Sequence, residues 1–450
     1  MIGLLAFSFV FGGASREHAV RLAMVELAAL PLLVLGLSQF NSAELIRRHR
    51  TVLLLAAAIA AVPLLQLVPL PPGVWTRLPG REPLVLALQL IGEPLGWIPL
   101  SLTPDKTWNA FLALIPPIAV FIALVVRREG SLARIAILTL LTFAFVNVAA
   151  AALQLASGDR RFYPYETTTA GFIAGLFANR NHFTTLLLTA MPFGAALAGE
   201  RVARRPDQLR LYVMLLAGGF AVVMLAVLAA QSRAGVLLFA PTLLLSILLA
   251  ARSARLRRPP RIVWAIGALL LLGGGAVTTV FLPSVLERFE SGDQVEARFQ
   301  RWPIVIEAGQ SYLPVGSGLG SFDPVFRTVE PLEQLDATFF NQAHNEYLEV
   351  WLETGWVGVG LILLVLVWWV KRSREVWFSI PGGGAPLQRA ASIAILVILI
   401  HSAVDYPLRT ETIAVVFAMA AAILEGGWDV AGTRTRRVRR VSSDHLEPQA

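Results

Sequence analysis

The polar stretch AHNEYLE, residues 343–349, stands immediately before a long apolar run, and its side chains are suited to proton transfer. A histidine has an ordinary pKa near ~6.5, so at neutral pH His344 can take a proton from an attacking hydroxyl group. Asn345 and Glu349 are spaced i and i+4, which places them on one face of a helix. We therefore expect His344 to act as a base, with Asn345 and Glu349 orienting it or binding sugar hydroxyls.

Arginines stand in further polar stretches at the ends of apolar runs, in FANRNHF, QSRAG and EARFQRW. A guanidinium group keeps its charge at physiological pH and presents a planar fork of donors that suits phosphate oxygens. Several such groups at one membrane face could hold a pyrophosphate, which indicates a lipid-linked donor. The candidate substrate ligands are Arg180, Asn181, Arg233, Arg298 and Arg301, together with His401 and Asp405 from the stretch HSAVDYPLR.

Each cluster also has a structural explanation that needs no substrate, because polar groups at a membrane interface often cap helices or form turns. No single cluster decides between the two explanations, and only their placement on one face of the membrane favours a shared site. The structural alternatives are a helix cap for Arg180 and His344, a polar turn for Arg233, a solvated helix face for Arg298 and Arg301, and a hydrogen-bonded pair for His401 and Asp405.

The composition is that of a membrane protein. Of the 450 residues, 56% are hydrophobic and only 15% are charged, and the mean hydropathy is +0.65. Cysteine is absent, which excludes disulfides, thiolate metal sites and cysteine nucleophiles. No HExxH, DxD or paired-cysteine pattern indicates a metal, so we expect neither a metal nor a cofactor. We attribute the net charge of +8 to membrane topology and not to nucleic-acid binding.

Apolar runs of about 18–22 residues recur along the chain, and each is long enough to cross the ~30 Å of hydrocarbon in a bilayer. Only helices satisfy their own backbone groups there, so we predict an all-α polytopic protein with about twelve transmembrane helices. Gly355, Gly358 and Gly360 are expected to let one of these helices pack closely against a neighbour. The predicted spans are 1–13, 19–39, 51–69, 107–126, 135–156, 179–198, 211–230, 234–250, 262–283, 345–370, 389–404 and 410–425.

The basic residues predict the orientation. With these spans, every arginine-rich link falls on one side, which the positive-inside rule makes cytoplasmic, together with both termini. Omitting the short first span would change the number of spans and leave the other orientations unchanged. All the polar clusters then lie at the opposite face. The predicted organisation is nine helices in 1–283, a large periplasmic segment over 284–344, three helices in 345–425 and a basic cytoplasmic tail over 426–450.

At these residues the sequence resembles the O-antigen ligase-related superfamily of bacterial membrane proteins. That superfamily contains O-antigen ligases, O-antigen and exopolysaccharide polymerases, and protein O-oligosaccharyltransferases. The resemblance covers roughly the C-terminal two thirds of the chain, and the ordered combination of motifs is more specific than any one of them. The motifs are FANRNHF, QSRAG, ARFQRW, PVGSGLGSF, AHNEYLEVWLETGWVG and HSAVDYPLR.

The resemblance implies a GT-C type glycosyltransferase of the bacterial inner membrane. It would act at the periplasmic face without a metal and would invert the anomeric centre. The donor would be a glycan on undecaprenyl pyrophosphate. By the family's pattern, His344 would activate the acceptor hydroxyl, while Arg233 and Arg298 would contact the pyrophosphate. The acceptor stays open between lipid A-core for a ligase, a second lipid-linked glycan for a polymerase, and a protein serine or threonine for an oligosaccharyltransferase.

A transporter is the alternative from a different class, because twelve spans with both termini inside is a common transporter plan. Transporters usually place charged substrate contacts near the bilayer midplane on broken helices. Here the charged clusters are predicted at the outer ends of the helices, which favours the transferase.

Overall fold

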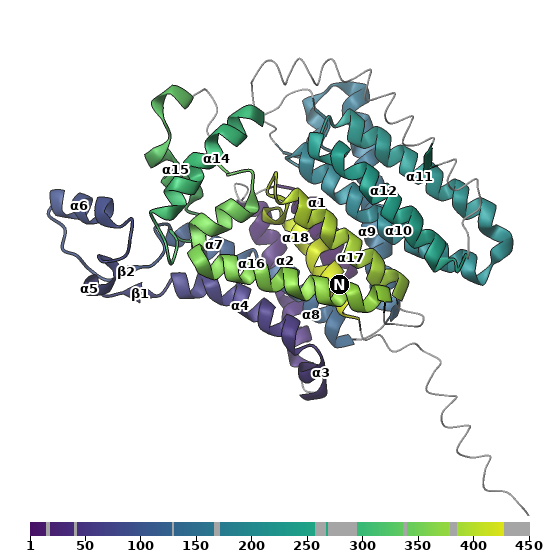
Figure 1. Ribbon diagram of the computed structural model, residues 1–450, viewed down its shortest axis with the longest axis horizontal. Helices are drawn as coiled ribbons and strands as arrows, with labels where there is room; N and C mark the ends of the chain where they lie inside the picture. Colours follow the sequence, from purple (N-terminus) through teal and green to yellow (C-terminus); the bar gives the residue numbers. More distant parts are fainter. Residues whose placement is uncertain are drawn as a thin grey trace, which may run out of the picture.

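The computed structural model describes residues 1–14, 19–39, 43–127, 130–165, 172–256, 267–268, 295–335, 340–378 and 385–426. Over these residues the chain is mostly helical (Figure 1), which confirms the predicted all-α membrane protein. The strands found in the described residues are β1 (Pro69–Leu70) and β2 (Ile98–Pro99), which pair antiparallel.

Within the described residues, seven stretches are long and apolar enough to cross a membrane. They are α2 (Ala19–Ser38), α7 with α8 (Pro104–Leu112, Ile115–Arg127), α9 (Gly130–Ser157), α10 (Arg180–Arg204), η2 with α11 (Pro206–Gln208, Leu209–Ala229), α12 (Arg233–Ser253) and α16 (Glu346–Phe378). Shorter apolar helices are α1 (Ile2–Phe11), α4 (Arg50–Gln66), α17 (Ala385–His401) and α18 (Glu411–Glu425). The predicted span 262–283 lies outside the described residues except at 267–268, so the number of spans stays a prediction.

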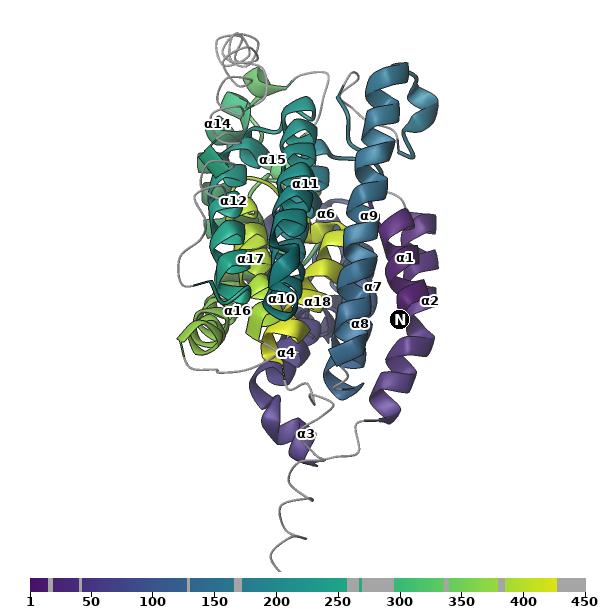
Figure 2. The same ribbon diagram turned by 90° about the vertical axis from the view of Figure 1, so that its right-hand side faces the viewer.

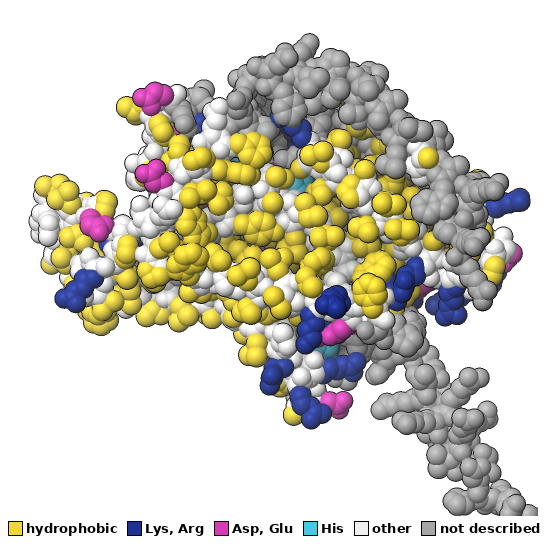
Figure 3. Space-filling model, in the orientation of Figure 1, with side chains coloured by type: hydrophobic (Ala, Val, Ile, Leu, Met, Phe, Trp, Pro, Cys, Tyr) yellow, Lys and Arg dark blue, Asp and Glu magenta, His cyan; other side chains and the backbone are white. Residues whose placement is uncertain are grey.

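The helices run side by side between two different ends (Figure 2). One end, here named the basic end, carries α3 (Ala43–Arg48) and the last turns of α8, α10 and α12, each of which contains arginine. Lys and Arg side chains gather around α3 in Figure 3, below a broad hydrophobic surface. The other end, here named the crown, is built from β1, α5 (Pro72–Trp75), α6 (Glu82–Leu90), β2, α14 (Val295–Gln310), α15 (Phe322–Val329) and η3 (Leu332–Gln334).

The core lies around α10, which is buried over most of its length between α9, α12 and α17. Large apolar side chains fill this core where helices meet: Leu124, Ile137, Phe193, Ile398 and Met419 are fully buried. By contrast, α2 and α11 leave most of their apolar surface exposed, as expected of helices that face lipid. The predicted segment 284–344 is helical in its described part, while 284–294, 336–339 and the tail beyond Gly426 lie outside the described residues.

Helix α16 is broken at Gly355, whose φ of 57° and ψ of −144° are not helical. The loop 314–321 fills the break: the carbonyl of Pro314 accepts from the Trp356 N–H at 3.0 Å, and Gly318 N–H donates to the Glu353 carbonyl at 2.9 Å. A Cβ at Gly355 would lie 2.1 Å from the Pro314 oxygen. The expectation of close helix packing therefore needs correction: Gly355 breaks the helix, and Gly360 has open space beside it.

Candidate active site

His344 lies at the junction between the crown and α16, in the left-handed backbone region with φ of 48°. The residue before it is held from two sides, because the Ala343 N–H donates to Glu349 Oε2 at 3.0 Å and the Trp302 indole donates to the Ala343 carbonyl at 2.9 Å. Asn345 caps α16 by accepting from the backbone N–H groups of residues 347 and 348. The start of α16 therefore fixes the position of the histidine.

The imidazole of His344 is paired with a carboxylate. Its Nδ1 lies 3.2 Å from Asp405 Oδ1, and its side chain is 14% exposed while that of Asp405 is fully buried. The same carboxylate accepts from its neighbour's backbone N–H at 2.9 Å and from the Asn181 side-chain amide. The ring of Tyr406 packs against His344 at 5.0 Å between centroids. We name His344 and Asp405 the dyad.

The charges around the dyad set its protonation. Burial and the nearby positive charge of Arg298 lower the pKa of His344, against the opposing effect of Asp405. Burial would raise the pKa of Asp405, but its hydrogen bond to His344 and the surrounding positive charges, Arg298 included, hold that pKa well below its usual range. An ionised carboxylate only accepts hydrogen bonds, so Nδ1 of a neutral His344 is the donor. Its Nε2 then has a free lone pair and can act as a base.

A chain of hydrogen bonds joins the dyad to the start of α12, where Arg233 stands. Ser232 caps α12 and donates to Asn181 Oδ1 at 2.8 Å, while the amide of Asn181 donates to Asp405. Asn179 caps α10 by accepting from the Asn181 N–H at 2.8 Å. Three stretches that are far apart in the sequence, FANRNHF, QSRAG and HSAVDYPLR, therefore meet at His344.

The four predicted arginines do not share one environment. Arg233 is the first residue of α12, next to Ser232, and Arg298 acts electrostatically on both members of the dyad. Arg180 is the first residue of α10 and lies over the Phe172 ring at 3.9 Å. Arg301, expected to bind phosphate, is only 8% exposed and pairs with Glu330 at 3.6 Å. The structure places Arg301 within the crown beside Glu330, and its binding of phosphate stays a prediction.

Glu349 faces a buried arginine. It is fully buried, and its Oε1 pairs with Arg409 at 2.9 Å, while Glu353 pairs with the same arginine at 2.7 Å. Because Glu349 also accepts from the backbone at Ala343, it connects the residue before His344 to the segment that carries Asp405. Asp405, and not Asn345 or Glu349, hydrogen-bonds to the imidazole of His344.

The buried histidines next to the dyad lie between helices. His401 is fully buried in α17, and its Nδ1 lies 2.7 Å from the Thr185 hydroxyl of α10, so its role in substrate binding stays a prediction. His401 and Asp405 are hydrogen-bonded through the backbone, where the Asp405 N–H donates to the His401 carbonyl at 3.0 Å, while the Asp405 carboxylate bonds to His344 and Asn181. His182 was not predicted as a site residue, and its Nε2 lies 4.0 Å from Asp405 Oδ1. Its place in FANRNHF, one residue after Asn181, was the available signal.

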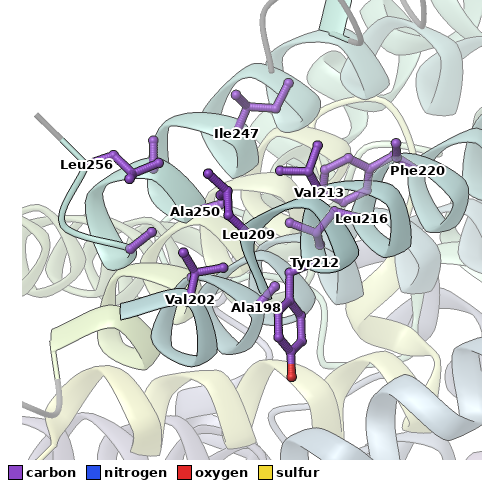
Figure 4. A pocket seen from close by; sticks show the side chains of 14 residues that line it. Ala198, Val202, Leu209, Tyr212, Val213, Leu216, Phe220, Ile247, Ala250 and Leu256 are labelled. Atoms are coloured by element: carbon purple, nitrogen blue, oxygen red, sulfur yellow. The ribbon is translucent and has the colours of Figure 1, made fainter. Parts of the chain in front are cut away.

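A separate hollow between α10, α11 and α12 carries no such chemistry (Figure 4). Its lining is apolar apart from the hydroxyl of Tyr212, and residues such as Val202, Leu209 and Leu256 place it towards the basic end. The polar groups of the dyad do not line it, so it is not the candidate site.

The site region matches a known family. Residues 218–363 match the family model described as O-antigen ligase, a range that includes Arg233, Arg298 and His344. No curated protein matches the chain. A membrane glycosyltransferase of the O-antigen ligase or polymerase type agrees with the helices that are long and apolar enough to cross a membrane. The match over residues 218–363 supports the resemblance of this chain to the O-antigen ligase-related superfamily.

Proposed function

We propose that this protein moves a glycan from undecaprenyl pyrophosphate to an acceptor hydroxyl at the periplasmic face of the bacterial inner membrane. The observation that carries the proposal is the hydrogen-bonded path from Ser232 through Asn181 and Asp405 to His344. It joins a neutral base to the helix end that carries Arg233. A base and cations beside one another are what transfer from a pyrophosphate donor requires.

In the proposed reaction, Nε2 of His344 takes the proton of the acceptor hydroxyl as the oxygen bonds to the anomeric carbon of the donor sugar. The bond between that carbon and the phosphate oxygen breaks, and its electron pair stays on the pyrophosphate. Asp405 stabilises the imidazolium that forms and keeps the proton on Nδ1 from being lost. Attack opposite the leaving group would invert the anomeric centre, as the GT-C class implies.

The leaving pyrophosphate gains negative charge, which Arg233 and Arg298 are placed to stabilise. Guanidinium groups bind phosphate oxygens through charge-assisted hydrogen bonds, so we propose a reaction that needs no metal. Arg180 and Asn181 stand at the start of α10, and Asn181 bonds to Ser232 beside Arg233. Both residues would therefore extend this donor site.

The proposed acceptor is lipid A-core, as for an O-antigen ligase, with polymerase and protein O-oligosaccharyltransferase as alternatives. Deleting the gene and separating the surface glycans on a gel distinguishes them. Free lipid-linked polymer with bare core would indicate a ligase, and single repeats on the core would indicate a polymerase. Unchanged surface glycans with one unglycosylated protein would indicate an oligosaccharyltransferase.

Complementing that deletion tests the site. We expect His344→Ala and Arg233→Ala to abolish detectable glycan transfer, since a general base alone contributes about 10²–10⁴-fold in rate. Arg327→Ala is the matched control, because Arg327 is an exposed crown arginine paired with Asp323. Membrane abundance of each variant is measured by immunoblot. Full transfer by both site variants would contradict the proposal, as would solute uptake by the purified protein without glycan transfer.

A further inference from the structure

Trp377, near the end of α16, is contacted at the basic end by two arginines from neighbouring helices. Its indole Nε1 donates to Ser392 Oγ of α17 at 3.0 Å, which holds the ring in place. The guanidinium carbons of Arg252, in the last turn of α12, and Arg389, early in α17, each lie 5.8 Å from the ring centroid. Helices α12, α16 and α17 therefore meet at one aromatic side chain whose ring attracts both cations.

The two arginines cap α16 with only part of their donors. Arg252 Nη2 donates to the Trp377 carbonyl at 2.9 Å, and Arg389 Nε donates to the Val376 carbonyl at 2.9 Å. The last carbonyls of a helix have no partner within it, so these two bonds complete the end of α16. A guanidinium group has five N–H donors, so each arginine keeps donors for which the described residues offer no acceptor.

This pair of positive charges has no acidic partner among the described residues. Arg372, also at the basic end, does have one, because it pairs with Glu425 at 3.4 Å. The links 254–266 and 379–384, which follow α12 and precede α17 in the sequence, contain no Asp or Glu. Arg389 is only 9% exposed, and a buried charge without a counter-charge is costly, so an anion at this place would stabilise both arginines.

The surroundings of the two arginines favour a lipid over a dissolved anion. Leu244 and Leu248 stand two turns and one turn before Arg252 on the same face of α12, and both are exposed. Phe378, which follows Trp377, is exposed as well. Exposed apolar side chains of a membrane helix face acyl chains, and cationic and aromatic groups where such a face ends lie at the depth of the lipid headgroups.

We propose that Arg252 and Arg389 bind the phosphate of an anionic phospholipid whose acyl chains lie along the exposed face of α12. Guanidinium groups bind phosphate oxygens through charge-assisted hydrogen bonds, and the negative charge of the lipid offsets the two positive charges. The lipid would join the ends of α12, α16 and α17, whose opposite ends adjoin Arg233, His344 and Asp405. This site is separate from the dyad and does not depend on the proposed function.

Lipid binding by the purified full-length protein, measured by native mass spectrometry, tests this site. The probes are phosphatidylglycerol and a phosphatidylcholine with the same acyl chains, whose choline group cancels the phosphate charge. We expect the wild type to bind phosphatidylglycerol more tightly. Arg252→Gln and Arg389→Gln should each weaken that binding about tenfold, the effect of losing a charge-assisted contact. Arg205→Gln is the matched control, because Arg205 is an exposed arginine at the end of α10 and its loss changes the net charge equally.

Arg252→Gln keeps the test decisive if the variant of the buried Arg389 does not fold, because Arg252 is exposed. Equal binding of the two lipids by the wild type would overturn the proposal. Unchanged phosphatidylglycerol binding in Arg252→Gln, or an equal loss in Arg205→Gln, would overturn it as well.

Thermal unfolding in detergent distinguishes a lipid from a dissolved anion. Added phosphatidylglycerol should raise the unfolding midpoint of the wild type more than that of Arg252→Gln, since a ligand that binds the folded state stabilises it. Inorganic phosphate at the same concentration should leave both midpoints unchanged. A rise with phosphate alone that is lost in Arg252→Gln would overturn the proposal by assigning the two arginines to a dissolved anion.

Discussion

At the scale of single residues, the proposed role of His344 as a base depends on the partner of its imidazole. Its Nδ1 bonds to Asp405, a residue 61 positions later in the chain, and this contact leaves Nε2 to act as the base. The motif pattern identified His344 as the base candidate, and the order of helices placed Asp405 at the same end of the bundle. Sequence spacing cannot show that the two side chains touch, because that contact depends on how α17 packs beside α16.

The pH dependence of transfer should report the dyad. Burial and the charge of Arg298 lower the pKa of His344, and only neutral His344 is a base, so wild-type activity should persist below pH ~6.5 and fall at lower pH. Asp405 raises the pKa of His344, so Asp405→Asn should move this acid limb to lower pH. The same variant should lower the rate by about 10²-fold or more, because the negative charge that stabilises the imidazolium and fixes its tautomer is lost.

Initial rates across a pH series, with wild type and Asp405→Asn at equal membrane abundance, check both effects. Asp323→Asn is the control, because Asp323 is a partly exposed carboxylate of the crown that pairs with Lys106 and Arg327. An unchanged rate and an unchanged acid limb in Asp405→Asn would remove Asp405 from the account.

At the scale of elements, the site is held by the break in α16 and by buried ion pairs. Arg409 binds Glu349 and Glu353, and Glu353 Oε1 also accepts from the Gly320 N–H at 2.9 Å. The sequence alone did not show that both acids bind the same arginine, because Arg409 lies in a distant stretch of the chain. The break at Gly355 was not predicted, because a glycine that breaks a helix and one that lets helices pack closely look the same in a sequence.

Gly355→Ala should destabilise the protein. An alanine would have to adopt φ near 57° and would place its Cβ 2.1 Å from the Pro314 oxygen. Strain of this kind costs about 1–3 kcal/mol, and the clash adds to it. Gly360→Ala is the control, since nothing lies within 4 Å of its added Cβ and alanine favours a helix over glycine.

Thermal unfolding in detergent, followed by tryptophan fluorescence, measures the difference. We expect a lower midpoint for Gly355→Ala and an equal or higher one for Gly360→Ala. Equal midpoints for the two variants would show that the break at Gly355 does not bear on stability.

At the scale of the whole molecule, the arginine-rich basic end and the crown lie at opposite ends of the bundle. Composition and hydropathy predicted this general architecture, because long apolar helices are the direct consequence of a lipid solvent. The number of spans was harder to predict. Helices such as α1 and α17 are shorter than a full crossing. The loop 314–321 fills the break in α16 through contacts between segments that are distant in the sequence.

The orientation can be measured with single cysteines, because the 450 residues contain none. Glu93→Cys lies in the crown and Asp207→Cys lies in η2 near the basic end, and both positions are exposed acids. Because basic links stay in the cytoplasm, a membrane-impermeant maleimide should label Glu93→Cys in spheroplasts and label Asp207→Cys only after lysis. The reverse labelling would place the dyad at the cytoplasmic face and contradict a periplasmic reaction.

The central claim is that the dyad transfers a glycan between two lipids. The direct test reconstitutes the purified full-length protein in liposomes with a glycan on undecaprenyl pyrophosphate and with lipid A-core, and measures the glycosylated lipid by mass spectrometry. The account predicts product with the wild type and with Arg327→Ala, and none above background with His344→Ala. Equal product from wild type and His344→Ala would contradict it.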